Sequence, residues 1–554
     1  MADSADRYDR RAFLARGAST AAAMGLAGVG VPALLSACGT STTTRSHGST
    51  PGVGTGTPRR GGSVTVGLNS EIDGFLPASS HFDNSGITYA NTVFDSLTRV
   101  GADGTAKPYL AKAVTPNADM TAWTITLRPD VSFHDGSAFT ADVLVANIEA
   151  LRHSLLTSQA LAPVSGVTAT GDLEVTISLD EPLVAFPHYL ATQIGYPVAM
   201  AQLTTTNTTH PIGTGPFMYE SWEPNDHFTA VRNPNYWRHG LPYLDGITYK
   251  PIPQDQSRES SLRSGTVDLM VTRDPHVIRD LGHATGYQQI ADLNQAHGQT
   301  DMDFIILNCA ADPTNDLMVR QALAHAMDTE QIVKLFGAGV TQQNTSLFPP
   351  GSPYRPAHNG YPAYDLNKAK QLVAQAAPNH GGSITITLDT VTDPRLLEII
   401  QAIANMWSLA GVHVTVGQVE QVTFIDNLVT SKFMAYTDEQ FSASDPDLNY
   451  VWMSPTTANP PISLNFSRNK DPLLEAALQR GRTSADPAVR AAAYQTVDER
   501  LAADLPYLWF SRATWSLTGT TAVANFNNMT LPDGSLDRGF ASGVFTPTST
   551  WRTA

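Results

Sequence analysis

The sequence DPDLN begins at Asp445 and places Asp447 and Asn449 at alternate positions, as at the start of a calcium-binding loop. Such a loop needs glycine at its sixth position and a bidentate glutamate at its twelfth. Here Tyr450 and Thr456 occupy these positions. The spacing of the oxygen ligands is therefore incomplete, and we do not expect calcium binding.

Other reactive side chains give no sign of catalysis. His134 lies in FHDG, but no further histidine or carboxylate stands at ligand spacing, so we predict a turn at Asp135–Gly136 rather than a metal site. Cys309 follows a short apolar run and is predicted to be a buried small side chain. The sequence contains no G-x-S-x-G, H-E-x-x-H or P-loop motif. We predict a protein that is not an enzyme and needs no metal or cofactor.

The other cysteine, Cys38, has a distinctive setting. Arg10 and Arg11 precede the weakly apolar run 18–37, which resembles a twin-arginine export signal. The run ends in LSAC, which resembles the lipobox of bacterial lipoproteins, in which the cysteine is lipidated and becomes the first mature residue. The alternative is an ordinary signal peptide in which Cys38 is incidental.

We therefore predict a signal peptide over 1–37 and a flexible tether over 38–60, where GTSTTTRSHGSTPGVGTGTPRR has almost no apolar content. No later apolar run approaches transmembrane length. The protein is expected to be exported and anchored to the outer face of the cytoplasmic membrane through a lipid on Cys38.

The composition fits a soluble body of two or three domains, with 554 residues of which 42% are hydrophobic. The net charge of −16 would repel phosphate backbones, so a nucleic-acid partner is not expected. We predict a monomer.

Periodicity predicts two kinds of region. In the first part of the chain we predict strands or hairpins over 62–68, 123–133, 166–179 and 217–231, and helices over 84–97 and 140–155. From about residue 312 helices and strands alternate, with helices over 315–336, 365–377, 394–411 and 486–505 and strands over 383–389 and 412–419. This alternation favours a mostly parallel sheet covered by helices.

These landmarks resemble those of a known family. The block KPYLAKAVTPNADMTAWTITLRPDVSFHDGSAFTADVL resembles the signature of the family 5 solute-binding proteins of ABC importers, the group of oligopeptide- and dipeptide-binding proteins. Further matches follow in the order of the family: PIGTGPFMYESW, RNPNYW, LPYLDGITYKPIP, LRSGTVDLM, VRQALAHAMD, LNKAKQLVAQAA, IANMWSLAGVHVTV and SDPDLNY. The resemblance spans roughly residues 60–510.

The resemblance implies an α/β fold of the class II periplasmic-binding-protein type, with two lobes around a cleft and an extra β-rich subdomain, as in cluster C. We expect the hinge crossovers near residues 305 and 506. The implied division is lobe I at 61–98, 211–305 and 506–554, the subdomain at 99–210, and lobe II at 306–505.

The implied function is capture of a peptide or similar small solute and delivery to the permease of an ABC importer, which hydrolyses ATP elsewhere. Ligand contact with both lobes would stabilise the closed form. Two alternatives stay open: a receptor of the same fold that signals to a partner, and a secreted hydrolase.

The sequence departs from the dipeptide binders of the family at both anchors. Glu439 stands where they have a tryptophan, Ser442 where they have the aspartate for the α-ammonium group, and Thr390 near the arginine for the carboxylate. Loss of such ion pairs from a closed cleft costs several kcal/mol. Tight dipeptide binding is therefore not expected, whereas longer peptides and uncharged or cationic solutes remain open.

Candidate ligand residues lie on two walls. Asp438 and Glu439 are candidates for receiving a cation, with Phe441 and Ser442 beside them. On the opposite wall we expect the residue pair His81–Phe82 after the first strand. Tyr236 and Trp237, in RNPNYW, are aromatic and are assigned to the core rather than to the ligand.

Overall fold

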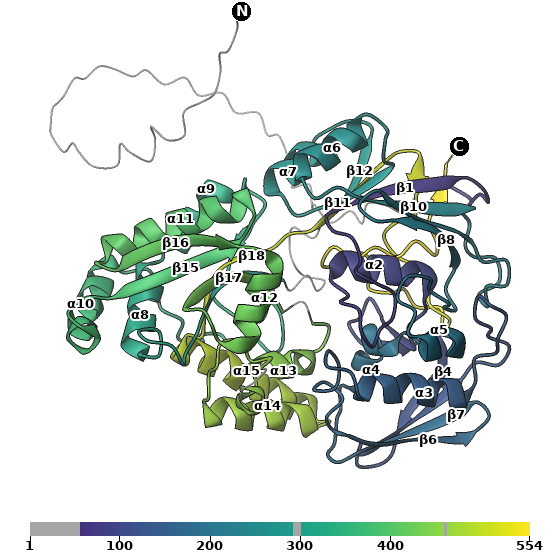
Figure 1. The fold of residues 1–554 in the computed structure, drawn as a ribbon, viewed down its shortest axis with the longest axis horizontal. Coiled ribbons are helices and arrows are strands. Elements are labelled where there is room, and N and C mark those ends of the chain that lie inside the picture. Colours follow the sequence, from purple (N-terminus) through teal and green to yellow (C-terminus); the bar gives the residue numbers. More distant parts are fainter. Residues whose placement is uncertain (1–55, 292–300, 442, 459–462, 554) are drawn as a thin grey trace, which may run out of the picture. The chain divides into compact units, whose positions relative to one another are not determined.

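A computed structural model of the chain describes residues 56–291, 301–441, 443–458 and 463–553 (Figure 1). The predicted signal peptide, most of the predicted tether with Cys38, and Ser442 lie outside the described residues.

The first sheet has the strand order β12-β19-β11-β1-β10-β9-β8. Its strands are β1 (Ser63–Leu68), β8 (Phe217–Glu223), β9 (His227–Arg232), β10 (Gly246–Pro251), β11 (Leu269–Thr272), β12 (Tyr287–Ala291) and β19 (Ser516–Thr520). β1 runs parallel to both of its neighbours, and β8 and β9 form the predicted hairpin. The helices connected with this sheet are α2 (Asn84–Val93), α6 (Asp255–Arg263) and α7 (Pro275–Gly282).

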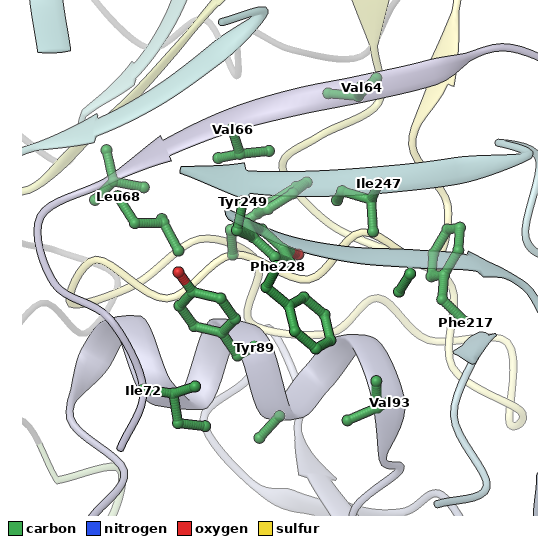
Figure 2. Packing of buried hydrophobic residues seen from close by; sticks show 14 of the residues in the cluster. Val64, Val66, Leu68, Ile72, Tyr89, Val93, Phe217, Phe228, Ile247 and Tyr249 are labelled. Carbon is green, nitrogen blue, oxygen red and sulfur yellow. The ribbon is translucent and has the colours of Figure 1, made fainter. Parts of the chain in front are cut away.

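Packing of α2 on the first sheet builds the core of this part of the chain (Figure 2). Val64 and Val66 of β1 lie on one face of the strand because alternate side chains of a strand share a face. Tyr89 and Val93, one turn apart on α2, pack toward the sheet. The helix is held at its start by Asp83, whose carboxylate accepts a hydrogen bond from the Gly86 amide.

The second sheet is antiparallel, with the order β4-β5-β7-β6. Its strands are β4 (Ala111–Pro116), β5 (Ala122–Leu127), β6 (Val164–Gly171) and β7 (Glu174–Leu179). The predicted hairpin over 166–179 is formed by β6 and β7. The ribbon β2 (Thr98–Val100) and β3 (Ala106–Pro108) precedes the sheet, and the associated helices are α3 (Ala141–Arg152), α4 (Phe186–Tyr189), η1 (Gln193–Gly195) and α5 (Met200–Thr205).

The third sheet has the order β14-β18-β13-β17-β15-β16. Its strands are β13 (Met302–Leu307), β14 (Gln342–Gln343), β15 (Thr385–Val391), β16 (His413–Val419), β17 (Ala435–Gln440) and β18 (Tyr507–Arg512). Only β17, β15 and β16 pair in parallel. The prediction of a mostly parallel sheet is wrong, because β13 is antiparallel to both neighbours and such pairs need no helical crossover.

Helices cover both faces of the third sheet. One face packs against α8 (Leu317–Ala326), α9 (Thr329–Phe336), α10 (Leu366–Ala376) and α11 (Pro394–Leu409), with η2 (Ala377–His380) after α10. The other packs against α12 (Gln421–Thr430), α13 (Tyr450–Met453), α14 (Pro472–Thr483) and α15 (Pro487–Asp504). The short turns η3 (Pro446–Asn449) and η4 (Pro455–Thr457) flank α13.

The helix predictions need correction in several places. The single helix expected over 315–336 is two helices, because the Asp328 carboxylate accepts from the Gln331 amide and starts α9 after α8 has ended. Several further helices, among them α6, α7, α12 and α14, lie outside the predicted helix ranges. α14 carries a clear start signal in Asp471, which accepts from two backbone amides ahead of Pro472.

The predicted crossovers near residues 305 and 506 also shift. β13 and β18 pair with each other in the interior of the third sheet, so the chain enters this sheet before residue 302 and leaves it after residue 512. The last strands are β20 (Val523–Ala524) and β21 (Trp551–Arg552). In the part of the chain that the structure describes, no helix has both the length and the apolar character that crossing a bilayer requires.

Candidate functional site

A cavity of about 360 Å³ lies where α2, the segment 537–544 and the segment 440–452 after β17 meet. A second cavity of about 610 Å³ adjoins it, because the two share a set of lining residues: Val100, Phe441, Ala443, Ser444, Asn449 and Arg538. The smaller cavity is within the size range of pockets that enclose small organic ligands.

One wall of the 360 Å³ cavity is built by a polar network around Asn91 of α2. The Asn91 Oδ1 atom accepts from the Tyr196 hydroxyl at 2.9 Å and from Arg99 Nη1 at 3.3 Å. Arg99 Nη2 donates to the Thr546 hydroxyl at 2.7 Å. Three segments far apart in the sequence are thereby fixed against one another, which positions Tyr196 and Arg99 at the cavity.

Charge on this wall comes from Arg99, Asp537 and Arg538. Arg99 Nη2 lies 3.8 Å from Asp537 Oδ2, and the exposed fraction of the aspartate side chain is 4%. Burial raises the pKa of Asp537, and the nearby Arg99 charge opposes that rise. Arg538 follows directly, with its backbone amide donating to the Val100 carbonyl at 2.8 Å, and it lines both cavities.

Another part of the lining carries aromatic rings from the segment after β17. Phe441 has a positive φ of 77°, which turns the chain out of the strand. Its ring stacks on Phe304, with 5.3 Å between the ring centres. Trp452 of α13 also lines the cavity and packs on Phe466 at 5.4 Å. Aromatic side chains and arginines thus line the same cavity.

Of the predicted ligand residues, Phe441 lies in the cavity wall and Ser442 is outside the described residues. Asp438 is half-buried on β17 and is not among the residues that line either cavity. Its carboxylate accepts from the Glu439 amide at 2.8 Å. Desolvation raises the pKa of Asp438 to about 7.

Glu439 is part of an ion pair between two sheets. Its carboxylate contacts the guanidinium of Arg273, which follows β11 of the first sheet. Arg273 also lies 3.6 Å from Asp303 of β13. Glu439 therefore neutralises a protein cation, which takes the place of the ligand cation expected from the sequence.

The residues expected on the opposite wall lie outside the cavity lining. His81 is exposed, with Nδ1 2.7 Å from the Asp73 carboxylate. Phe82 packs on the core beside Tyr196, 6.2 Å between ring centres. Thr390, at the position of the missing arginine, is buried and accepts from the Thr437 hydroxyl at 2.7 Å.

The two aspartates of DPDLN are engaged with arginines. Arg490 donates to both carboxylate oxygens of Asp445 at 2.8 Å, and Arg482 donates to Asp447 at 3.1 Å. Within the described ranges no group of three or more histidine, cysteine or acidic side chains is arranged to hold a metal ion.

The remaining reactive side chains have structural surroundings. Burial lowers the pKa of His134 to about 4, and its Nε2 lies 3.1 Å from the Gly215 carbonyl. Burial raises the pKa of the Cys309 thiol to about 11. Tyr236 and Trp237 both donate to the buried Asp95, at 2.9 and 2.8 Å, so these two rings belong to the interior as predicted.

Sequence reasoning missed the residues that give the cavity its character: Asn91, Arg99, Tyr196, Trp452 and Arg538. They are separated by up to several hundred residues and none lies in a motif with a chemical meaning of its own. No local signal could have brought them together, because the fold alone makes them neighbours.

Comparison with known proteins identifies the family. Residues 105–461, more than half of the chain, match the profile described as "Bacterial extracellular solute-binding proteins, family 5 Middle". The chain belongs to the family 5 solute-binding proteins. The family and fold expected from the sequence motifs are therefore confirmed.

Individual relatives of this family 5 protein differ in what they are named for. The glutathione-binding protein GsiB of Pectobacterium atrosepticum is 24% identical over 463 residues, covering 81% of this chain and 88% of the relative. The nickel-binding periplasmic protein of Escherichia coli K12 is 30% identical over 311 residues, 54% of this chain and 59% of the relative.

Among solved structures, the periplasmic binding protein DppA of Helicobacter pylori in complex with the peptide STSA superposes with a TM-score of 0.78. It is 20% identical to this chain, and the match covers 90% of this chain and 99% of that protein. This likeness shows that the chain has the α/β periplasmic-binding-protein fold.

As a member of family 5, the chain is an extracytoplasmic solute-binding protein that works with the permease of an ABC importer. It is not an enzyme, and the hydrolase alternative is set aside by its family.

Proposed function

We propose that the protein captures a small, peptide-like solute with a carboxylate group in the 360 Å³ cavity and passes it to the import permease. The observation that carries this proposal is the composition of the cavity wall: two arginines and aromatic side chains line the same space of ligand size. A guanidinium binds a carboxylate through two parallel hydrogen bonds, and the rings provide apolar contact for the rest of the solute.

The distribution of charge favours an anionic group on the solute. Arg99, Asp537 and Arg538 are the charged residues that line the cavity, so its fixed charge is positive. The carboxylates expected to attract a cation are elsewhere, since Glu439 is paired with Arg273 and Asp438 is outside the lining. The carboxylate among the lining residues, Asp537, is buried beside Arg99 and is therefore already paired with a protein cation.

The sizes of the two cavities favour a solute comparable to a short peptide. The 360 Å³ cavity suits a compact ligand, and the adjoining 610 Å³ cavity offers space for an extension past Arg538. Relatives named for glutathione and for peptide complexes fit this chemistry, because both ligands carry carboxylates. Reduced glutathione is therefore the first probe we choose.

The predicted division into two lobes and a subdomain supplies the retention mechanism. A solute that contacts both walls binds more tightly to the closed state, in which the walls approach each other, than to the open state. The ratio of these two affinities sets how far the solute shifts the equilibrium toward the closed state. We further propose that a lipid on Cys38 keeps the mature protein on the outer face of the cytoplasmic membrane, with 38–60 as the tether, and that the protein is a monomer.

Native mass spectrometry of freshly purified protein tests the proposal, because a solute enclosed between two walls survives purification. We expect an adduct with the mass of a carboxylate-bearing compound. Reduced glutathione at about 100 times its dissociation constant should add about 2.7 kcal/mol to the free energy of unfolding. Arg538→Gln should weaken glutathione binding about tenfold, since it removes a charge-assisted contact.

Arg232→Gln is the matched control, because Arg232 pairs with the partly exposed Asp245 on the first sheet and does not line the cavity. It should bind glutathione as the wild type does. Equal loss in both variants, or stabilisation by cationic solutes in place of anionic ones, would reject the proposed site chemistry.

A further inference from the structure

A buried polar cluster joins the β-rich part of the chain to the cavity wall. The Tyr189 hydroxyl, at the end of α4, lies 3.0 Å from the Asp447 carboxylate and 3.1 Å from the Asp447 carbonyl. Arg482 of α14 donates to Asp447 at 3.1 Å and to the Tyr189 hydroxyl at 3.2 Å. These three side chains come from positions as far apart as 189 and 482, and each contacts the other two.

The cluster is withdrawn from water. The exposed fractions of the Asp447 and Arg482 side chains are 1% and 3%. Arg482 also stacks over the Tyr450 ring at 3.8 Å from its centre. A buried ion pair is held only when further hydrogen bonds satisfy both partners, and Tyr189 supplies one of these to each.

Neighbouring contacts join the same two surfaces. Arg482 Nη1 lies 3.6 Å from Glu181, and the Val184 amide donates to the Arg482 carbonyl at 3.2 Å. His188 Nδ1 lies 3.1 Å from the Ser444 hydroxyl. The segment 181–189 thus contacts the third-sheet region at several points around the cluster.

Asp447 is not itself a lining residue, but it lies within the segment that lines the two cavities. It lies in η3, and the residues that follow it, Leu448, Asn449 and Trp452, line the 360 Å³ cavity. The start of this turn is held by Arg490, which donates hydrogen bonds to both carboxylate oxygens of Asp445. Movement of Asp447 away from Tyr189 would therefore carry the cavity wall with it.

From this geometry we infer that Tyr189 and Arg482 are positioning residues for solute retention. Through Asp447 they hold the wall segment 444–452 against the β-rich subdomain, so that the solute is kept between Trp452 and the arginine wall. The inference rests on the proposed function, since it assigns these residues to the same cavity. On this inference the β-rich subdomain has a role in binding, because its contacts position one wall of the proposed site.

The test compares Tyr189→Phe with the wild type. The variant keeps the buried ring and loses only the hydroxyl that contacts Asp447 and Arg482. In the absence of solute, hydrogen–deuterium exchange of the backbone amides in 444–453 should be about fivefold faster. With reduced glutathione as probe, dissociation should be accelerated by a similar factor while association changes little.

Tyr249→Phe is the matched control, because it also removes a buried phenol hydroxyl, which lies 2.7 Å from that of Thr92 in the first-sheet core. Its exchange in 444–453 and its glutathione kinetics should be those of the wild type. The double variant Tyr189→Phe/Asp447→Asn should release glutathione no faster than Asp447→Asn alone, as expected if the hydroxyl acts through the carboxylate.

The outcomes separate the two proposals. Unchanged exchange in Tyr189→Phe, or equal acceleration in Tyr249→Phe, overturns the positioning role even if glutathione binds. If neither glutathione nor a copurified solute is found on the wild type, the proposed solute class fails, and the exchange data alone decide the positioning role. If Tyr189→Phe does not fold, Glu181→Gln, which removes the outer partner of Arg482, takes its place in the same comparison.

Discussion

Asp438 and Glu439 are adjacent carboxylates whose surroundings differ because successive side chains of a strand face opposite sides. Asp438 stands opposite Phe304 in β13, beside aromatic side chains, whereas Glu439 stands opposite Asp303 and reaches Arg273. Sequence alone treats both residues as solvated acids or ligand anchors. The strand register decides between a desolvated carboxyl group and an ion pair.

For Glu439→Gln we expect a loss of about 1–2 kcal/mol in the free energy of unfolding, because Arg273 loses the nearer of two carboxylates in a partly buried site. Urea denaturation of the solute-free protein measures this loss. Glutathione affinity should stay within about threefold of the wild type. The double variant Arg273→Gln/Glu439→Gln should be no less stable than Glu439→Gln alone. If Glu439→Gln instead loses much of its glutathione affinity, Glu439 contacts the solute.

Asp438→Asn should act on stability in a pH-dependent way. The folded-state pKa of about 7 exceeds the ordinary value of 3.8, so the folded protein holds the proton more tightly than the unfolded chain. The contribution of Asp438 to the free energy of unfolding is therefore fully present below pH 4 and is lost as the pH rises from 4 toward 8. The variant should match the wild type at pH 4 and be more stable by about 1 kcal/mol at pH 8, allowing for partial exposure.

Thermal unfolding at the two pH values measures this difference. Asp389→Asn, on the neighbouring strand, is the comparison, because Asp389 is another carboxyl group whose pKa is raised by burial. An Asp438→Asn variant that is less stable than the wild type at pH 8 would show that Asp438 is ionised and paired in the folded protein.

At the scale of elements, the break between α8 and α9 shows how a single cap overrides a continuous apolar pattern. Residues 315–336 repeat apolar side chains at helical spacing throughout, which predicts one helix. The Asp328 carboxylate offers the Gln331 amide a better partner than helix continuation does. Asp328→Ala should cost about 1 kcal/mol in urea denaturation, whereas Asp328→Asn should cost only a few tenths.

Elements could be predicted from local patterns, but their pairing could not. The alternation in 62–68 predicts β1, although β1 pairs with strands about two hundred residues away. The hairpin over 166–179 is different, because its two strands β6 and β7 follow each other in the chain and pair as expected. The place of β13 between β17 and β18 depends on residues more than one hundred positions away. The start of α14 at Asp471–Pro472 was a readable signal that was overlooked.

At the scale of the whole molecule, the family could be read from motif order, whereas the binding site could not. The cavity draws on α2, Tyr196, the segment after β17 and the segment around Arg538. Among the predicted ligand residues that the structure describes, Phe441 alone lines the cavity. The motif SDPDLNY contributes Ser444 and Asn449 to the lining, whereas Arg99, Tyr196 and Arg538 come from outside the motifs that indicated the family.

The last prediction concerns attachment of the molecule to the membrane. Cys38→Ser should transfer the protein from washed membranes to the soluble fraction, because acyl chains bind a bilayer through about 0.8 kcal/mol per buried methylene and serine cannot accept them through a thioether. Cys309→Ser is the control, since the second cysteine is half-buried in the folded part of the chain and its replacement should leave the protein on the membrane. Immunoblotting of the fractions measures both.

The released Cys38→Ser protein and the retained Cys309→Ser protein should bind glutathione equally. Every residue that lines the cavity lies between 84 and 544, beyond the predicted tether. If Cys38→Ser protein remains on washed membranes, the run 18–37 is acting as an uncleaved anchor and the lipid is not needed. If the soluble variant binds the probe and the retained control binds it equally, anchoring and capture are separable properties, and the tether sets only where the solute is caught.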